Sequence, residues 1–380
     1  MSNSQNPLRQ LERFGQSVWL DYIRRQLLSS AEFRRMIDED GLKGMTSNPT
    51  IFEKAIDGSN DYEDQFEKLA RAGRSVDEIY EALTTDDIKA AADAMRPVYD
   101  RTEGRDGFVS YEVSPLLAHD TDGTIKAAHR YWKLIGRPNL LIKVPSTPEG
   151  IPAVEQLISE GHNINITLMF SLKHYDTVAE AYIRGLERRA RAGQPIDRIA
   201  SVASVFVSRV ETLVDKRIDD QLKGRVNEAL AALRGCAAVA GTKFIYQRFK
   251  EIFGGDRFKA LAARGARVQR PLWASTGTKN PAYSDIKYVQ ELIGPDTVNT
   301  MPPATMDAYR DHGQPRATVE EDLAGARETV RRLAAAGIDL DAVGDELQKE
   351  GVELFSKSFD ELLAAIKRRH AEVGAGSAAR

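Results

Sequence analysis

Lys143 stands in an apolar, β-branched stretch, residues 140–144, that ends at Pro145. Side chains alternate between the two faces of a β-strand, so Lys143 shares a face with Leu141 and Pro145. Parallel strands are usually covered on both faces, and burial of the ammonium group favours the uncharged amine. A free amine is the nucleophile that condenses with a ketone to form a Schiff base. The alternative is a lysine at a strand end that reaches solvent, and a permanent ion pair would also contradict the catalytic interpretation.

Other polar residues stand near the ends of strand-like stretches. Glu112 lies between a tyrosine and a valine, where a carboxylate without a partner would be costly. Taken singly, Asp21 or Asn48 is explained as a helix cap, and Ser204 as a small core residue. Polar residues that fall on the same face of successive strands are harder to explain by chance, which favours a shared site. Its members are Asp21, Asn48, Glu112, Lys143, Asn165, Thr167 and Ser204.

These residue types suit the steps of Schiff-base chemistry on a sugar. After Lys143 attacks a ketone, Glu112 and Thr167 would carry the protons needed to expel water from the carbinolamine. Asp21 would take the proton from a substrate hydroxyl when a carbon–carbon bond is cleaved. Neutral donors and acceptors for sugar hydroxyls complete the set: Asn48, Asn165 and Ser204.

A cation and a hydroxyl-rich loop follow the sixth and seventh strand-like stretches. Arg209 stands just beyond the sixth, and Ser275-Thr276-Gly277-Thr278-Lys279 follows the seventh. Barrel enzymes commonly bind phosphate in their late loops, and a loop rich in glycine and hydroxyl groups can form an anion nest. We therefore expect Arg209, Ser275 and Lys279 at a phosphate site, with an ordinary polar turn as the alternative for the loop.

Strand-like and helical stretches alternate along the chain, which favours a parallel sheet wrapped by helices. The eight expected strands are residues 17–21, 41–48, 107–113, a stretch around Lys143, 163–170, 199–207, 270–275 and 297–301. No Gly-x-Gly-x-x-Gly follows the first strand, so a closed (β/α)₈ TIM barrel is preferred to a dinucleotide-binding sheet.

Alternation also predicts which side chains point into the barrel. In the fifth strand Thr167 and Met169 would point inward, while Leu168 and Phe170 would pack under helices. The same rule predicts which residues share a face in the last two strands, and we expect these faces to point inward. Trp273 shares a face with Ser275 in the seventh strand, and Thr297 shares a face with Asn299 and Met301 in the eighth. Nearly every strand becomes polar at its C-terminal end, where barrel enzymes carry their active sites.

The chain is expected to form one barrel domain over residues 1–380, since no linker separates two halves. Its strands would occupy about 17–301, followed by a helical C-terminal extension at about 304–373 and a disordered tail at 374–380. Two helical insertions, at about 53–103 and 210–266, account for much of the length beyond a minimal barrel. The sequence does not reveal what these insertions do.

Composition excludes several classes of protein. A net charge of −3, from 53 basic and 56 acidic residues without a basic block, argues against nucleic acid as the main partner. The single cysteine, Cys236, excludes an intrachain disulfide and fits a reducing compartment. Without an apolar signal or a membrane-spanning run, we expect a cytoplasmic protein with no membrane contact. The six histidines include no His-x-x-x-His pair, so we expect no metal and no redox cofactor in the reaction.

Six segments together resemble the transaldolase family, whose members are class I aldolase-type transferases of the pentose phosphate pathway. The segments are Val18–Asp21, Gly44–Pro49, Tyr111–Val113, Leu141–Thr147, Asn163–Ser171 and Ser204–Arg209. The resemblance covers roughly residues 17–305, and the insertions and C-terminal extension resemble the longer bacterial branch of that family.

The resemblance implies a role for each polar residue named above. It implies Lys143 as the Schiff-base lysine and Asp21 as the base for aldol cleavage. The implied holders of the catalytic water are Glu112 and Thr167. The implied sugar site is lined by Asn48, Asn165, Ser204 and Phe206, and the implied phosphate site by Arg209 and Ser275. Many members have an arginine soon after the serine that matches Ser275, whereas this chain has Lys279. A lysine cannot bind phosphate through two donors as an arginine can, so the role of Lys279 stays open.

The implied reaction moves dihydroxyacetone from sedoheptulose 7-phosphate to glyceraldehyde 3-phosphate, giving erythrose 4-phosphate and fructose 6-phosphate. One alternative is a fructose-6-phosphate aldolase-type lyase, whose members resemble shorter chains with tyrosine in place of Glu112. Another is a catalytically silent barrel that binds sugar phosphates. The presence of Asp21, Glu112 and Lys143 together argues against this alternative. Sugar phosphates are the expected partners, and barrels of this kind often form homodimers. Acceptor preference and oligomeric state are not readable from the sequence.

Overall fold

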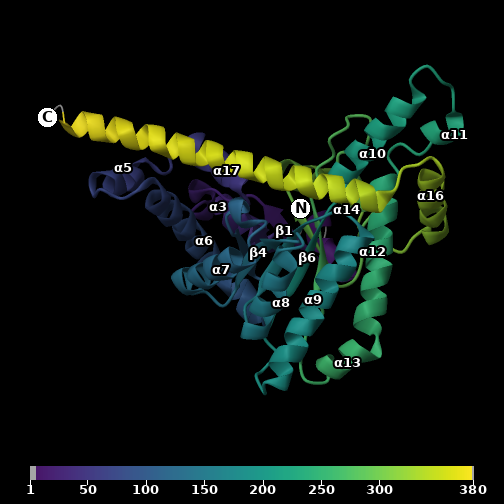
Figure 1. Ribbon diagram of the computed structural model, residues 1–380, viewed down its shortest axis with the longest axis horizontal. Helices are drawn as coiled ribbons and strands as arrows, with labels where there is room; N and C mark the ends of the chain where they lie inside the picture. The colour runs from purple at the N-terminus through teal and green to yellow at the C-terminus, as the bar shows by residue number, and fades with distance from the viewer. Residues whose placement is uncertain (1–5, 379–380) are drawn as a thin grey trace.

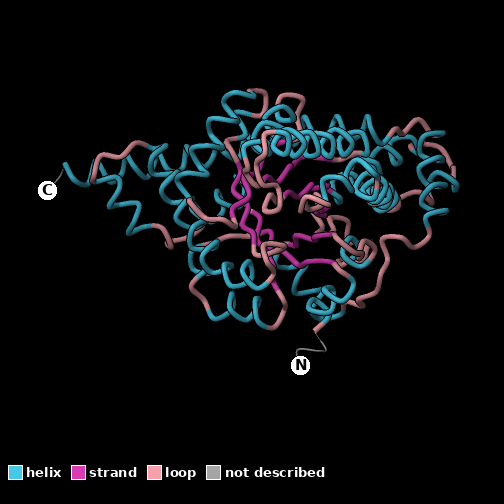
Figure 2. Tube along the Cα trace, turned by 90° about the horizontal axis from the view of Figure 1, so that it is seen from below, coloured by secondary structure: helices cyan, strands magenta, loops and turns pink. Residues whose placement is uncertain are grey.

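The computed structural model describes residues 6–378, with side chains up to Val373. Its centre is a closed barrel of eight parallel strands in sequential order, surrounded by helices (Figure 2). The strands are β1 (Gln16–Asp21), β2 (Leu42–Thr46), β3 (Phe108–Glu112), β4 (Leu140–Pro145), β5 (Ile164–Met169), β6 (Ser201–Phe206), β7 (Arg270–Ala274) and β8 (Thr297–Met301). Each lies where the sequence predicted a strand, and the predicted (β/α)₈ fold class is confirmed.

Helices cover the outside of this barrel. The first half of the chain contributes α1 (Pro7–Gln10), η1 (Leu11–Phe14), α2 (Arg25–Leu28), α3 (Ala31–Asp38), α4 (Pro49–Asp57), α5 (Glu63–Arg71), α6 (Val76–Arg101), η2 (Pro115–Leu117), α7 (Thr121–Ile135), α8 (Gly150–Glu160) and α9 (Leu172–Arg191). The second half contributes α10 (Val207–Leu222), α11 (Glu228–Ala231), α12 (Ala237–Gly254), α13 (Asp256–Ala262), α14 (Lys287–Gln290), α15 (Pro303–His312), α16 (Leu323–Ala335) and α17 (Leu340–Ala378). Within residues 6–378, none of these helices combines the length and apolarity needed to cross a membrane.

The last helix, α17, is 39 residues long and crosses the molecule beside the barrel (Figure 1). It packs against α4, α5, α6 and α10, and it also contacts β5. Of the tail expected to be disordered, residues 374–378 continue α17, while 379 and 380 lie outside the described residues. A segment far from the barrel strands in sequence therefore lies against their C-terminal ends.

Strand pairing orients the early strands as alternation predicted. Glu112 of β3 pairs with Lys143 of β4, and Lys143 pairs with Asn165 of β5, so the three share the inner face. The amide of Asn165 hydrogen-bonds Ser110 on one side and Ser204 of β6 on the other, across the barrel interior. Short polar side chains can meet in this way because the interior of an eight-stranded barrel is filled by layers of side chains.

The late strands correct the expected orientation. Leu272 of β7 pairs with both Ser204 and Val298, so the inward set on β8 includes Val298 and Thr300. Of the predicted set, Trp273, Thr297 and Asn299 lie on the outer face and bond groups outside the barrel, whereas Ser275 follows β7 and lines the cavity described below. Their partners are the carbonyl of Leu292 for Trp273, the side chain of Gln16 for Thr297, and Thr276 with the Tyr288 carbonyl for Asn299. Alternation separates two faces but cannot say which is inner when both carry polar residues.

Two residues in the left-handed backbone region also end the alternation. Leu168 has φ +58° where the β5–β6 register shifts, and Ser275 has φ +53° just after β7. Because a left-handed backbone redirects the side chain, the alternation predicted for residues 163–170 stops at Leu168. The ring of Phe170 then lies 5.3 Å from that of Phe206, centroid to centroid. The hydroxyl of Ser275 lies 2.9 Å from that of Ser208.

Candidate active site

A cavity of about 310 Å³ opens at the C-terminal ends of the strands. Nine of the eleven residues proposed from the sequence line it: Asp21, Asn48, Lys143, Thr167, Ser204, Phe206, Arg209, Ser275 and Lys279. The other two, Glu112 and Asn165, are buried directly beside Lys143 on the neighbouring strands. The site predicted from the separate strands is thus brought together by the closure of the barrel.

Lys143 lies on the inner wall of the barrel and is paired. Its Nζ atom lies 3.1 Å from Oε2 of Glu112, and both side chains are only 5% exposed. The Nζ atom also donates a hydrogen bond of 3.2 Å to the carbonyl oxygen of Ser47. Glu112 Oε2 has no aligned hydrogen-bond donor within the described part of the chain, so the ion pair is close but poorly oriented. The lysine is buried as predicted, but the prediction of an unpaired amine is wrong.

Burial raises the pKa of Glu112, although attraction to Lys143 opposes the shift and the nearby Asp21 adds to it. A carboxyl group with a raised pKa accepts a proton readily, so Glu112 is suited to take up and return protons beside Lys143.

Asp21 faces the same lysine from β1. Its Oδ1 atom accepts a 2.6 Å hydrogen bond from Thr46, whose hydroxyl lies 2.7 Å from that of Thr300. Enclosure by the barrel raises the pKa of Asp21, while attraction to Lys143 and the bond from Thr46 oppose the shift. One lysine thus lies near two carboxyl groups that are both poor anions, which suits proton transfer.

The neutral residues divide into those open to the cavity and those that support it. Thr167 Oγ1 is buried and has no hydrogen-bond partner among the described residues, so it is free to bind a group in the cavity. Asn48 accepts a 2.9 Å bond from the backbone of Ile51 and caps α4, which leaves its NH₂ group for the cavity. Asn165 bonds Ser110 and Ser204 and does not line the cavity. Asn48 therefore caps α4 and also lines the cavity.

The cationic end of the cavity lies near the start of α10. The guanidinium carbon of Arg209 lies 5.5 Å from the ring centroid of Phe206 and 5.7 Å from that of Phe355. Burial lowers the pKa of Arg209, although attraction to Glu350 opposes the shift. Ser275 and Lys279 line the same cavity. A half-buried cation beside hydroxyl groups favours an anionic ligand such as phosphate.

The sequence patterns did not reveal the contribution of α17. Phe355 and Ser358 from this helix line the cavity, and the ring centroid of Phe355 lies 5.9 Å from Lys143 Nζ. The side-chain amide of Gln348 donates to Ser146 and to the carbonyl of Leu168, which ties α17 to the ends of β4 and β5. Lys54, Thr46 and Thr300 are further lining residues absent from the predicted set. Only Thr46 had a sequence signal, its alternation with Asn48.

Comparison with known proteins supplies an independent result. Residues 18–366 match the model of the family described as Transaldolase/Fructose-6-phosphate aldolase. The protein named Transaldolase from Trichodesmium erythraeum is 48% identical over 370 residues, covering 96% of this chain and 97% of that protein. The Transaldolase of Thiobacillus denitrificans is 48% identical over 361 residues, covering 95% and 99% of the two chains. That of Mycolicibacterium smegmatis is 48% identical over 366 residues, covering 96% and 98%.

Proposed function

This chain belongs to the transaldolase/fructose-6-phosphate aldolase family, and on that basis we propose that it is a metal-independent transferase acting through a lysine Schiff base. It moves dihydroxyacetone from sedoheptulose 7-phosphate to glyceraldehyde 3-phosphate, giving erythrose 4-phosphate and fructose 6-phosphate. The observation that carries the proposal is the buried amine of Lys143 at the cavity floor, 3.1 Å from the carboxyl group of Glu112.

Schiff-base formation uses the proton held between Lys143 and Glu112. The neutral amine attacks the C2 carbonyl of the ketose. Glu112 gives its proton to the resulting alkoxide and takes one from the nitrogen, which leaves a neutral carbinolamine and a protonated Glu112. Glu112 then protonates the departing hydroxyl group, which leaves as water, while Thr167 binds that water at the wall of the cavity. The free hydroxyl of Thr167 and the raised pKa of Glu112 support these roles.

Carbon–carbon cleavage requires a base near the substrate hydroxyl. Asp21 takes the proton from the C4 hydroxyl, the C3–C4 bond breaks, and its electron pair moves into the iminium group to give an enamine on Lys143. The aldose phosphate leaves, the acceptor aldehyde enters, and the same steps run in reverse. Thr46, bonded to Asp21 at 2.6 Å, holds this carboxyl group in place.

Binding of the donor follows the polarity of the cavity. Asn48, Ser204 and Phe206 contact the sugar, with Asn165 holding Ser204, and Arg209, Ser275 and Lys279 bind the phosphate. Arg209 is a half-buried cation that lines the cavity together with Ser275 and Lys279, which supports this assignment. We place the protein in the cytoplasm, supported by its single cysteine, and propose a homodimer, to be tested by light scattering.

Borohydride reduction in the presence of fructose 6-phosphate tests the nucleophile. The expected result is a three-carbon adduct on the peptide that contains Lys143, because borohydride reduces the Schiff base of the dihydroxyacetone unit to a stable amine. An adduct on another lysine, or none, contradicts the proposal. Free dihydroxyacetone, measured with and without an aldose phosphate acceptor, separates transfer from simple cleavage, since a transferase releases little without an acceptor.

A further inference from the structure

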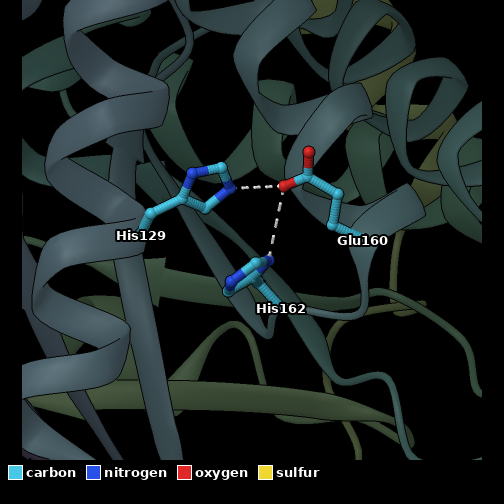
Figure 3. A group of neighbouring side chains, drawn as sticks. All are labelled: His129, Glu160 and His162. Atoms are coloured by element: carbon cyan, nitrogen blue, oxygen red, sulfur yellow. Dashed lines mark hydrogen bonds and ion pairs between the residues drawn. The ribbon is translucent and has the colours of Figure 1, made fainter.

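Three side chains of types that can ligate a metal meet at one point (Figure 3). The elements that carry them place this cluster at the N-terminal end of β5, away from the cavity. His129 comes from α7, Glu160 is the last residue of α8, and His162 precedes β5. One donor atom from each lies within 4.8 Å of the others. None of the three lines the active-site cavity, which begins near Thr167 at the other end of β5.

Both imidazole rings are directed at the same carboxylate oxygen (Figure 3). Oε2 of Glu160 lies 2.5 Å from Nε2 of His129 and 3.8 Å from Nδ1 of His162. Ligand atoms at about 2.1 Å from a tetrahedral Zn²⁺ ion lie about 3.4 Å apart. His162 is therefore already near the required spacing from Glu160, and the exposed ring of His129 has only to withdraw by about 1 Å.

Neighbouring groups hold two of the three ligands in orientation. The ring of His162 packs edge-on against Trp132, with 4.9 Å between centroids. Its Nδ1 atom also lies 3.2 Å from the carbonyl oxygen of Leu157, and this contact must be given up when Nδ1 binds the ion. The other carboxylate oxygen of Glu160 accepts a hydrogen bond from Gln156. Outer partners of this kind orient the ligands of natural metal sites.

We propose that His129, Glu160 and His162 form a binding site for a divalent transition metal ion, with Zn²⁺ as the best fit. Two imidazole nitrogens and one carboxylate oxygen are ligands that Zn²⁺ accepts, and water completes the coordination on the exposed side of His129. The site is structural, because it ties α7 and α8 to the start of β5 and lies away from the cavity. Sequence spacing did not reveal it, because 33 residues separate the two histidines.

Titration of the full-length, chelator-treated protein with ZnCl₂ tests the site. We expect one ion bound per chain by calorimetry and a higher melting temperature, since an ion that binds the folded state stabilises it by mass action. Co²⁺ should give a visible absorption spectrum typical of nitrogen and oxygen ligands. His129→Ala and His162→Gln should each weaken binding by about tenfold or more.

Two further variants make the result decisive. His119→Ala removes an exposed histidine whose Nδ1 lies 3.0 Å from a single carboxylate, Glu149, and it should leave Zn²⁺ affinity unchanged. Glu160→Gln keeps the size of the side chain but not its charge, and it should weaken binding and alter the Co²⁺ spectrum. The proposal is overturned by the lack of stoichiometric binding, or by wild-type affinity in both His129→Ala and His162→Gln.

Discussion

The barrel holds two buried ion pairs, one at each end, and they differ in how completely they are satisfied. At the C-terminal end Lys143 faces Glu112, and at the N-terminal end Arg270 of β7 lies 3.1 Å from Asp106. The side chains of the second pair are 7% and 2% exposed, so the two pairs are buried to a similar degree. Burial of charge therefore does not distinguish the active end of the barrel.

Hydrogen bonding does distinguish them. Both oxygens of Asp106 are occupied, by Arg270 and Trp19 on one and by Ser17 on the other. Arg270 also donates to Ser17 and to the carbonyl of Thr297. Nε of Arg270 has no partner among the described residues, but both oxygens of its carboxylate partner are bonded, so the pair is held in one arrangement. This end of the barrel is suited to stability.

The hydrogen bonding of the Lys143–Glu112 pair, at the C-terminal end, is less complete. Glu112 Oε2 is without an aligned donor among the described residues, a second carboxyl group, Asp21, lies near the same lysine, and burial raises the pKa of both acids. Incomplete pairing next to a cavity leaves a proton that can move and an amine that a substrate can reach. Chemistry at this end of the barrel therefore follows from an incompletely bonded carboxylate beside a cavity rather than from buried charge alone.

Replacing Lys143 should have the largest effect. Lys143→Met removes the nucleophile, so transfer activity should fall by about 10⁴-fold or more, and no borohydride adduct should form. The melting temperature should change little, because Glu112 can accept a proton and become neutral once the lysine is gone. Steady-state assays, trapping and thermal melting check the three parts. Substantial turnover by a folded Lys143→Met protein would show that the active end does not depend on this amine.

Breaking the N-terminal pair should give the opposite pattern. Asp106→Asn leaves the guanidinium of Arg270 buried without a countercharge, so the free energy of unfolding should fall by about 3–5 kcal/mol. The kcat of the folded fraction should stay near the wild-type value, because the pair lies away from the cavity. Urea denaturation and activity at low temperature measure the two effects. A large loss of kcat with stability unchanged would reverse the assigned roles of the two ends.

The raised pKa of Glu112 predicts a dependence of stability on pH. An acid whose pKa is raised by folding stabilises the native state below its unfolded pKa and loses that contribution as pH rises through the folded pKa. Stability should therefore decline with rising pH above the ordinary glutamate range, by at most about 1.4 kcal/mol per pH unit for this group. Urea midpoints measured across pH should show a smaller decline for Glu112→Gln. An identical slope in the variant would exclude Glu112 as the source.

Lys279 should show the smallest effect. Lys279→Met removes a point charge from the phosphate end of the cavity, so KM for the sugar phosphate should rise about fivefold with kcat nearly unchanged. Arg209→Met is the matched comparison and should raise KM more, because a guanidinium can bind phosphate through two donors. An equal rise in KM for the two variants would mean that Lys279 contributes as much to phosphate binding as Arg209 does. An unchanged KM for Lys279→Met would mean that Lys279 does not bind the phosphate.

The sequence by itself determined the strands and most of the candidate site. Alternation and residue type placed Lys143 and Glu112 on inward faces, and the eight strands were predicted within a few residues of their ends. These features are local, because the period of a strand and the proline and hydroxyl residues that end it are written in adjacent positions.

Only the tertiary structure decided the contacts between distant segments. Strand register put Glu112 beside Lys143 as a partner, and closure of the barrel turned the polar face of β8 outward and Thr300 inward. The docking of α17 added Phe355, and the packing of α7 beside α8 brought His129 to Glu160. Such contacts depend on how elements pack, and the periodicity of one segment carries no information about the neighbour it will meet.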